Sequence, residues 1–219
     1  MLMRLFELVT FENKLELFEQ VGHENLVQSL EKEPGTWCMI VAHDLANPLL
    51  KYVFEVYKDE SAYETHISSS HFQAFATFAK EGFSSRKVLA LHPEITYEKE
   101  TIKKDIFANE AIFHLVRVTV NPKNSEDFRL IVSEEMACSI EKEEGVLALI
   151  SGCDQNHPSH WYFFEVYKNE EAYNSHKLTP HFKNYIERTK KMVEDKVFYG
   201  VKMDAMISQG KLNGGVVHD

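Results

Sequence analysis

The sequence predicts an α+β fold in which one small domain, with the element order β-α-β-β-α-β, occurs twice in tandem. The first observation is a gapless internal match, because 54–72 and 164–182 lie 110 residues apart and agree at 11 of 19 positions. The same offset continues outside this stretch and places Leu5 on Leu115. The third observation is a hydrophobic pattern that switches between strand and helix periods in the same order in each copy. A repeat of roughly a hundred residues is too long for a solenoid unit, so each copy should be a domain.

Each copy contains the same expected elements. In copy one they are a strand at 5–11, a helix carrying Phe18, Leu26 and Leu30, strands at 36–46 and 51–58, a helix around 72–79, and a closing strand near 87–97. The first helix should end at Gly35, or at Gly145 in copy two, where a glycine suits a left-handed cap. Gly22 interrupts the apolar stripe of this helix in copy one, whereas copy two has Val132 there. The resulting order is ferredoxin-like, with both helices on one face of the sheet.

We place the two copies at residues 1–98 and 108–207. The charged segment 99–107 suits a short helical connector, and the glycine-rich segment 208–219 suits a flexible tail. The strand at 52–57 is apolar on both faces, so the face of the sheet without helices also needs cover. We therefore expect the two sheets to pack on each other as an internal pseudo-dimer, forming a barrel of about eight strands. Whether whole chains pair further as a homodimer stays open.

Composition excludes several classes of protein. With 44% hydrophobic and 12% aromatic residues among 219, the chain can bury a sizeable core. The net charge is −10 and no basic stretch compensates for it, which argues against a nucleic-acid or membrane partner. No segment suits a signal peptide or a membrane span. The three cysteines, Cys38, Cys138 and Cys153, are odd in number and lack metal-ligand spacing, which is typical of reduced thiols in a cytoplasmic protein.

Both copies repeat a set of side chains that can carry proton chemistry. They are Glu55, Tyr57, His66 and His71 in copy one, and Glu165, Tyr167, His176 and His181 in copy two. The Glu and the Tyr are two apart on a strand and therefore share a face. A carboxylate buried there needs a partner, and the first His on the following helix is the nearest one expected. Such a pair could hold one ring nitrogen protonated while the other faces a ligand.

The second His follows the first after five residues, which on one continuous helix would point the two about 140° apart. In copy two Pro180 should interrupt the helix and let both His face one cavity. Two His without further ligand spacing give weak support for a metal. A purely stabilising hydrogen-bond network is the alternative for the whole set, and duplication alone does not decide between the two.

The repeated motif resembles the signature of the antibiotic biosynthesis monooxygenase family. In copy two the matching residues are Phe164, Glu165, Tyr167, Ala172, His176, Thr179, His181 and Phe182. The resemblance implies a dimeric α+β barrel and oxygenation of electron-rich phenols, anthrones or quinols by dioxygen without flavin, metal or haem. Copy one has Ser70 in place of Pro180, so copy two is nearer to the pattern and is the preferred site if only one copy is active.

The chemistry implied by the resemblance needs a base that deprotonates a small substrate, whose anion then reduces dioxygen. We expect His176 or His181 to be this base, with Glu165 orienting the imidazole and Tyr167 binding the substrate oxygen. Two other functions fit the same residues. One is an isomerase of a small dicarbonyl or phosphorylated metabolite, for which Lys177 and Arg188 are possible anchors; the other is a ligand-binding or stress protein without catalysis.

Overall fold

The chain forms two compact units in the computed structural model. The structure describes residues 1–99, 102, 106–107, 111–213 and 215–216. Unit 1 comprises Met1–Ala90, Ile102–Ala108 and Gly200–Gln209; unit 2 comprises Leu91–Thr101, Asn109–Tyr199 and Gly210–Asp219. Each unit therefore takes residues from both halves of the sequence.

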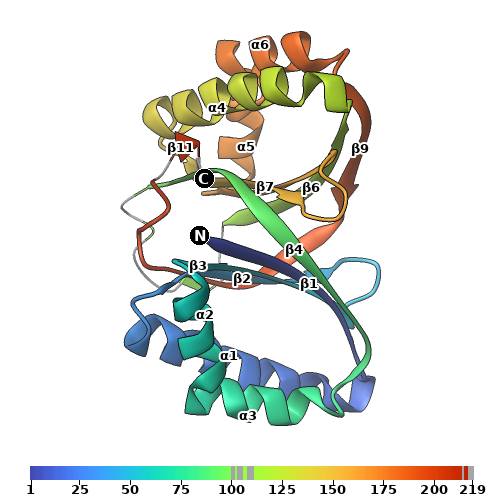
Figure 1. Cartoon of the computed structure of the whole chain (residues 1–219), viewed down its shortest axis with the longest axis vertical. Helices are drawn as coiled ribbons and strands as arrows, with labels where there is room; N and C mark the ends of the chain where they lie inside the picture. The colour runs from blue at the N-terminus through green and yellow to red at the C-terminus, as the bar shows by residue number, and fades with distance from the viewer. Residues whose placement is uncertain (100–101, 103–105, 108–110, 214, 217–219) are drawn as a thin grey trace. The chain divides into compact units, whose positions relative to one another are not determined.

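Unit 1 is an antiparallel sheet covered on one face by three helices (Figure 1). Its strands lie in the order β5-β10-β2-β3-β1-β4, and only the first part of β4 belongs to this unit. The elements are β1 Leu2–Thr10, α1 Leu15–Lys32, β2 Thr36–Asp44, β3 Leu50–Tyr57, α2 Glu60–Ser68, α3 Ser70–Ala79, β4 Phe83–Glu98, β5 Ile106–Phe107 and β10 Val201–Ser208, with a short 3-10 helix, η1 Glu12–Lys14, before α1.

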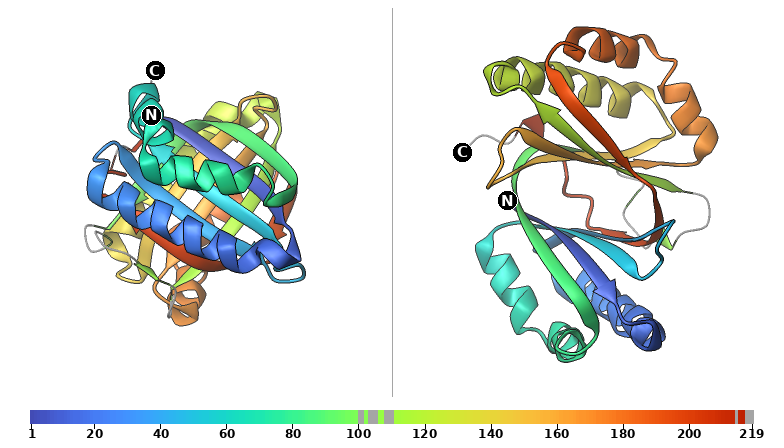
Figure 2. Two further views of the ribbon diagram at one scale, coloured as in Figure 1. Left: turned by 90° about the horizontal axis from the view of Figure 1, so that it is seen from below. Right: turned by 90° about the vertical axis from the view of Figure 1, so that its right-hand side faces the viewer.

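Unit 2 repeats this arrangement with its own three helices on one face of its sheet (Figure 2). Its strand order is β4-β7-β8-β6-β9, beginning with the second part of β4, and β11 pairs with that same strand. The elements are β6 Ile112–Val120, α4 Ser125–Lys142, β7 Val146–Asp154, β8 His160–Tyr167, α5 Glu170–His176, α6 Pro180–Thr189, β9 Val193–Tyr199 and β11 Gly215–Val216, with the 3-10 helix η3 Pro122–Asn124 before α4. The α+β class and the two βαββαβ repeats are thus confirmed.

The last strand of each repeat pairs, wholly or in part, with a strand of the other repeat. In β4, the residues from Leu91 onward pair with β7, and Leu91 lies opposite Asp154. Conversely, β10 at the end of repeat two pairs with β2 of repeat one. The expectation that the strand near 87–97 closes only its own copy is therefore wrong. Periodicity shows where the backbone is extended, but it does not show which neighbour receives its hydrogen bonds.

Gly35 and Gly145 are required for close packing and not for a left-handed cap. Among the described residues, Gly210 alone has a positive φ, so the predicted cap geometry is absent at both positions. A Cβ on Gly35 would lie 2.6 Å from the Cβ of Ala62, and one on Gly145 would lie 2.4 Å from that of Ala172. Each glycine lets the second helical region approach the end of the first helix.

Two predicted segments lie partly outside the described residues. The connector at 99–107 is one of them, and among its described residues Ile106–Phe107 form strand β5 and not the expected helix. Part of the predicted flexible tail does contact unit 2, because Leu212 is fully buried and its N–H donates to Glu98 Oε1 at 2.9 Å. The limits of the two copies stay a prediction. Within the described ranges no helix has both the length and the apolarity needed to cross a bilayer. All three cysteines are free thiols, and Cys38 and Cys153 are buried.

Candidate functional site

The two predicted site histidines of unit 1, His66 and His71, converge on one carboxylate, that of Glu33 at the C-terminal end of α1. His66 Nδ1 lies 2.9 Å from Glu33 Oε2, and His71 Nε2 lies 2.6 Å from Glu33 Oε1. Thr36 Oγ1 donates to Glu33 Oε2 at 2.6 Å. Burial raises the pKa of Glu33, but the hydrogen bonds from His66, Thr36 and His71 and the charge of His66 outweigh it, so the pKa is lowered. The ionised carboxylate therefore ties α1 to α2 and α3.

Unit 2 contains the same network. His176 Nδ1 and His181 Nε2 lie 2.9 Å and 2.7 Å from Glu143 Oε1. Glu143 is aligned with Glu33, and its pKa is also lowered, because the bonds from both His outweigh the effect of burial. The predicted hydrogen-bond partners of the first His, Glu55 and Glu165, are thus wrong in both copies. The observed partners, Glu33 and Glu143, lie in segments 31–35 and 141–145, which also match between the copies. Each is 33 positions before the first His in the sequence.

The predicted interruption between the two His occurs in both copies, including the copy without proline. Ser69 accepts a hydrogen bond from Phe72 N, and Thr179 accepts one from Phe182 N. A hydroxyl N-cap thus starts a new helix, α3 or α6, between the two His. The cap residue was the signal that sequence reasoning missed in copy one.

The predicted pairing of Glu and Tyr on one strand face is observed. Tyr57 Oη donates to Glu55 Oε2 at 2.9 Å, and Tyr167 Oη donates to Glu165 Oε2 at 3.1 Å. Burial first, and the neighbouring carboxylate second, raise the pKa of Tyr57 and of Tyr167 well above 10. Both phenols therefore stay protonated and act as donors to the carboxylate.

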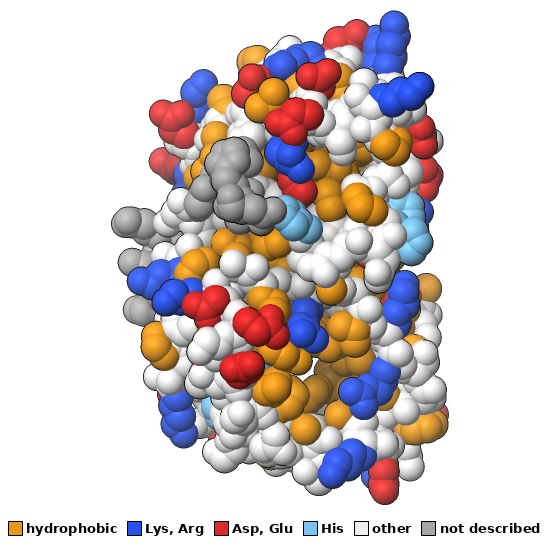
Figure 3. Space-filling model, viewed as in Figure 1, with side chains coloured by type: hydrophobic (Ala, Val, Ile, Leu, Met, Phe, Trp, Pro, Cys, Tyr) orange, Lys and Arg blue, Asp and Glu red, His pale blue; other side chains and the backbone are white. Residues whose placement is uncertain are grey.

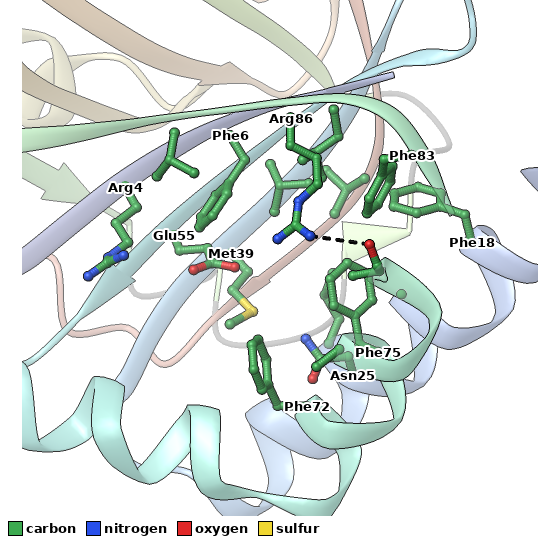
Figure 4. A pocket seen from close by; sticks show the side chains of 18 of the residues that line it. Arg4, Phe6, Phe18, Asn25, Met39, Glu55, Phe72, Phe75, Phe83 and Arg86 are labelled. Atoms are coloured by element: carbon green, nitrogen blue, oxygen red, sulfur yellow. Dashed lines mark hydrogen bonds between the residues drawn. The ribbon is translucent and has the colours of Figure 1, made fainter. Parts of the chain in front are cut away.

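A cavity of about 330 Å³ lies between the helices and the sheet of unit 1 (Figure 4). Its opening is visible as a hollow bordered by hydrophobic side chains on the surface of this unit (Figure 3). The aromatic residues among its lining come from the sheet and from all three helices: Phe6, Phe18, Tyr63, Phe72, Phe75 and Phe83. This size and lining are typical of a site for a small, flat, apolar ligand.

Four polar residues also line the cavity. Glu55, Arg4 and Arg86 project from the strands and Asn25 projects from α1 (Figure 4). Arg4 lies opposite Glu55 in the β1–β3 ladder and stacks on Tyr63, with its Cζ 4.0 Å from the ring centroid. Asn25 is 6% exposed, and its Oδ1 has no hydrogen-bond partner among the described residues. A buried amide without a partner at a cavity wall is what a bound ligand or water can satisfy.

The histidines lie behind the cavity wall. Of the described residues that line the cavity, none is His66 or His71, whereas Glu55 is one of them. The ring of His66 packs on Tyr57 with centroids 5.4 Å apart. Glu55 is therefore the member of the predicted set that a ligand can contact. Burial raises the pKa of Glu55, and the charge of His66, which also packs on Tyr57, partly offsets this rise.

Unit 2 has almost no cavity at the corresponding place. The space among Glu165, Tyr167, His176 and their neighbours measures about 20 Å³, which is room for about one water molecule. Val132 replaces Gly22 and Phe163 replaces Val53, and both larger side chains are buried in the core of unit 2. A Cβ built on Gly22 meets nothing within 4 Å, so the missing side chain leaves open space in unit 1.

The aligned carboxyl groups of Glu55 and Glu165 also differ in the direction of their pKa shifts. Burial raises the pKa of Glu55, and the charges of His66 and Arg4 and the bond from Tyr57 only partly offset this. Burial acts on Glu165 in the same direction, but His114 and Lys196 outweigh it and lower its pKa. A carboxylate with a raised pKa is the better general base near neutral pH.

The comparisons with known proteins agree with this architecture. The family model for antibiotic biosynthesis monooxygenase matches residues 1–77 and 111–188. The chain belongs to the antibiotic biosynthesis monooxygenase family. A search of curated proteins found no match.

Several solved structures are similar over the full length. One, from Lactobacillus acidophilus NCFM and described as a candidate monooxygenase, is 30% identical, has a TM-score of 0.89 and covers 99% of each chain. A second candidate monooxygenase, from Fusobacterium nucleatum, is 20% identical with a TM-score of 0.84, over 100% of this chain and 97% of that one. An anthrone oxidase-like protein is 12% identical with a TM-score of 0.55, over 99% and 96% of the two chains. The last two share the fold alone.

Proposed function

We propose that unit 1 of this family member is a cofactor-independent monooxygenase site for a small phenol, quinol or anthrone-like substrate. The observation that carries the proposal is the aromatic-lined cavity of about 330 Å³ in unit 1, with the carboxyl group of Glu55 on its wall. In this proposal unit 2 keeps the scaffold but binds no substrate, because its equivalent space is about 20 Å³. We therefore propose copy one as the active copy, in place of copy two, which the sequence motif favoured.

The proposed reaction begins with transfer of a proton from the substrate to Glu55. For an anthrone-like CH2 group, the resulting carbanion passes electrons to dioxygen, and the two combine at that carbon as a peroxide anion. This anion takes the proton back from Glu55 and becomes a hydroperoxide. Loss of water leaves a carbonyl group, so one oxygen atom enters the product and the other leaves as water. The substrate is oxidised and dioxygen is reduced. Arg4 and Arg86 stabilise the intermediate anion, since both guanidinium groups line the cavity.

The histidines take a positioning role in this proposal. Tyr57 donates to Glu55, and His66 packs against Tyr57 while Glu33 holds its ring. His66 and His71 therefore keep the carboxyl group in place without touching the substrate. His176, His181, Glu165 and Tyr167 form the matching scaffold of unit 2.

Oxygen consumption with a panel of anthrones and hydroquinones tests the reaction. Glu55→Gln keeps the size of the side chain but cannot accept a proton, so turnover should fall by about 10²–10⁴-fold while the ligand still binds. The matched control is Glu165→Gln, the same change at the aligned position of unit 2. A loss of turnover in Glu165→Gln, with Glu55→Gln unaffected, would place the reaction in unit 2 and overturn the proposal.

The cavity is tested by filling it with the side chains of unit 2. The double variant Gly22→Val/Val53→Phe should abolish both ligand binding and oxygen uptake. Its fold should persist, because Val132 and Phe163 occupy the aligned positions of unit 2. Binding that survives in a folded double variant would exclude this cavity as the site.

An isomerase acting on a small anionic metabolite is the second candidate. The two arginines that line the cavity favour it, because a phosphorylated or enediolate substrate needs a cationic anchor. The anchors expected from sequence lie elsewhere: Lys177 stacks on Tyr173, and Arg188 pairs with Glu134 on the surface. Conversion of a phosphorylated ketose-like substrate without oxygen uptake would favour the isomerase. Binding without conversion of either substrate class would favour the non-catalytic alternative.

A further inference from the structure

A cluster of two His and one Asp lies at the turn between β7 and β8. Asp154 is buried, with 6% of its surface exposed, and His157 Nδ1 lies 3.1 Å from its Oδ2. The rings of His157 and His160 stack with centroids 5.4 Å apart and planes 22° apart. One ligand atom from each of the three residues lies within 4.8 Å of the other two. The cluster lies outside the proposed active site and has no part in the mechanism above.

The two other groups of His and carboxylate side chains are less suited to an ion, because their histidines are already bound to Glu33 or Glu143. Glu135, which also groups with His176 and His181, lies 3.7 Å from His176 Nε2 but is itself buried. A tetrahedral ion with bonds of about 2.0–2.2 Å holds its ligand atoms about 3.3–3.6 Å apart. Glu33 lies only 2.6 Å and 2.9 Å from its two His, and Glu143 only 2.7 Å and 2.9 Å from its own. Those are hydrogen-bond lengths in filled networks. Asp154 and His157 are also at hydrogen-bond distance, 3.1 Å, but the side chain of His157 is exposed, so an ion can reach it from solvent.

The turn also leaves an open approach for an ion. The side chain of His157 is 65% exposed, whereas the Asp154 carboxylate is 9% exposed and held in place by the N–H of Asn156 at 2.9 Å. A fixed carboxylate beside one exposed and one half-buried imidazole is a ligand set that suits Zn²⁺, Cu²⁺ or Ni²⁺ and not Mg²⁺ or Ca²⁺.

We propose that Asp154, His157 and His160 bind one transition-metal ion of the zinc, copper or nickel class. The ion takes the place of the hydrogen between His157 Nδ1 and Asp154, and the neutral imidazole then carries its proton on Nε2. Three protein ligands leave at least one coordination position open to water or to another donor.

Copy one supplies a natural comparison for this turn. Asp44 occupies the position of Asp154, and its Oδ1 accepts from Ala46 N at 2.9 Å as Asp154 Oδ1 accepts from Asn156 N. Leu50 N donates to Asn47 O at 2.8 Å, and His160 N donates to His157 O at the same distance. Asn47 and Leu50 therefore stand on the same backbone turn without the two imidazoles.

The test is titration of the full chain, freed of metal by a chelator, with Zn²⁺ in an isothermal calorimeter. We expect one tight ion per chain, with binding that weakens as the pH falls and the imidazoles are protonated. His157→Asn/His160→Leu installs the residues of copy one and should weaken this binding on the order of 100-fold. The reciprocal variant Asn47→His/Leu50→His should add a second ion. If the double variant unfolds at a lower temperature than the wild-type chain, the single variant His157→Asn replaces it in the titration.

Two results would overturn the proposal. One is the absence of binding heat in the wild-type chain with Zn²⁺, Cu²⁺ and Ni²⁺. The other is equal affinity in the wild-type chain and in the folded His157→Asn/His160→Leu variant, which would assign the ion to the Glu33 or Glu143 network. Neither depends on oxygenase activity, so the metal site stands or falls separately from the proposed function.

Discussion

At the scale of single residues, the two copies differ in charge at the aligned position of Asn25 and Glu135. In unit 1 the neutral amide of Asn25 faces open space. In unit 2 Glu135 is 9% exposed, accepts a hydrogen bond from Ser139 at 2.7 Å and lies 3.7 Å from His176 Nε2. Burial, assisted by the charges of Glu165 and Glu143, raises the pKa of Glu135 to about 7. The closely packed interior of unit 2 thus contains a carboxyl group, that of Glu135, which keeps its proton up to about pH 7.

The raised pKa predicts a pH-dependent penalty on stability. In the unfolded chain Glu135 ionises near its ordinary pKa of 4.5, whereas in the folded chain it keeps its proton up to about 7. The penalty is absent below pH 4.5, grows between 4.5 and 7, and is complete above 7. At about 1.4 kcal/mol per pKa unit it amounts to about 3 kcal/mol. Glu135→Gln should therefore stabilise the protein at pH 8 by up to that amount and should have little effect at pH 4.5.

Chemical denaturation at the two pH values measures this difference. Glu134→Gln is the control, because Glu134 neighbours Glu135 in sequence but is exposed and pairs with Arg188. A gain that is equal at both pH values would show that the charge of Glu135 is not its cause.

At the scale of elements, helix α1 contains a glycine that opens the cavity. Gly22 lies inside the helix, where glycine costs about 1 kcal/mol relative to alanine. Gly35 follows the same helix but packs against Ala62. Gly22 thus leaves open space beside α1, whereas Gly35 lets α2 pack closely against the end of α1.

The same substitution at these two glycines should have opposite effects. Gly22→Ala should raise the free energy of unfolding by about 0.5–1 kcal/mol, because its Cβ meets no neighbour within 4 Å. Gly35→Ala should lower it by about 1–3 kcal/mol, because its Cβ would lie 2.6 Å from that of Ala62. Thermal and denaturant unfolding measure both. A stable Gly35→Ala variant would show that α2 can move away without cost.

At the scale of the whole molecule, each exchanged strand carries a carboxylate at an irregular position of its ladder. Glu94 lies at the register shift between Pro93 and Ile95, and Asp204 lies at the shift between Met203 and Ala205. In unit 2, Arg129 binds Glu94 through two nitrogens at 2.5 Å and 3.1 Å. In unit 1, His43 lies 2.6 Å from Asp204 and Lys51 lies 3.7 Å from it. In each case the basic partner of the carboxylate comes from the repeat with which the strand pairs, and this contact fixes the register of the strand.

Removing one of these carboxylates should loosen the exchanged strand selectively. Glu94→Gln keeps the shape but loses the charge opposite Arg129, and should cost about 1.5–3 kcal/mol. Amide hydrogen exchange should then quicken in residues 91–98 of β4, which pair with β7, more than in the part of β4 beside β1. Glu126→Gln removes the exposed partner of the same arginine and is the control. Uniform acceleration along β4 would contradict a local role in register.

Much of this architecture follows from the sequence by itself. The duplication, the βαββαβ order and the Glu–Tyr pair on one strand depend on local periodicity, which one chain displays directly. The helix restart in copy two was predicted from Pro180, whereas the cap signal of Ser69 in copy one was present in the sequence but not used.

The tertiary structure decided three features that no local pattern contains. Glu33 became the acceptor for His66 and His71 because the end of α1 lies beside α2 and α3, although 33 residues separate Glu33 from His66. The last strand of each repeat pairs with a strand of the other repeat. The sequence could not show this, because backbone hydrogen-bonding groups are alike in every strand and do not identify a partner. The cavity is found in unit 1 because an empty space is set by the summed volumes of side chains from separate elements, here Gly22 with Val53 against Val132 with Phe163.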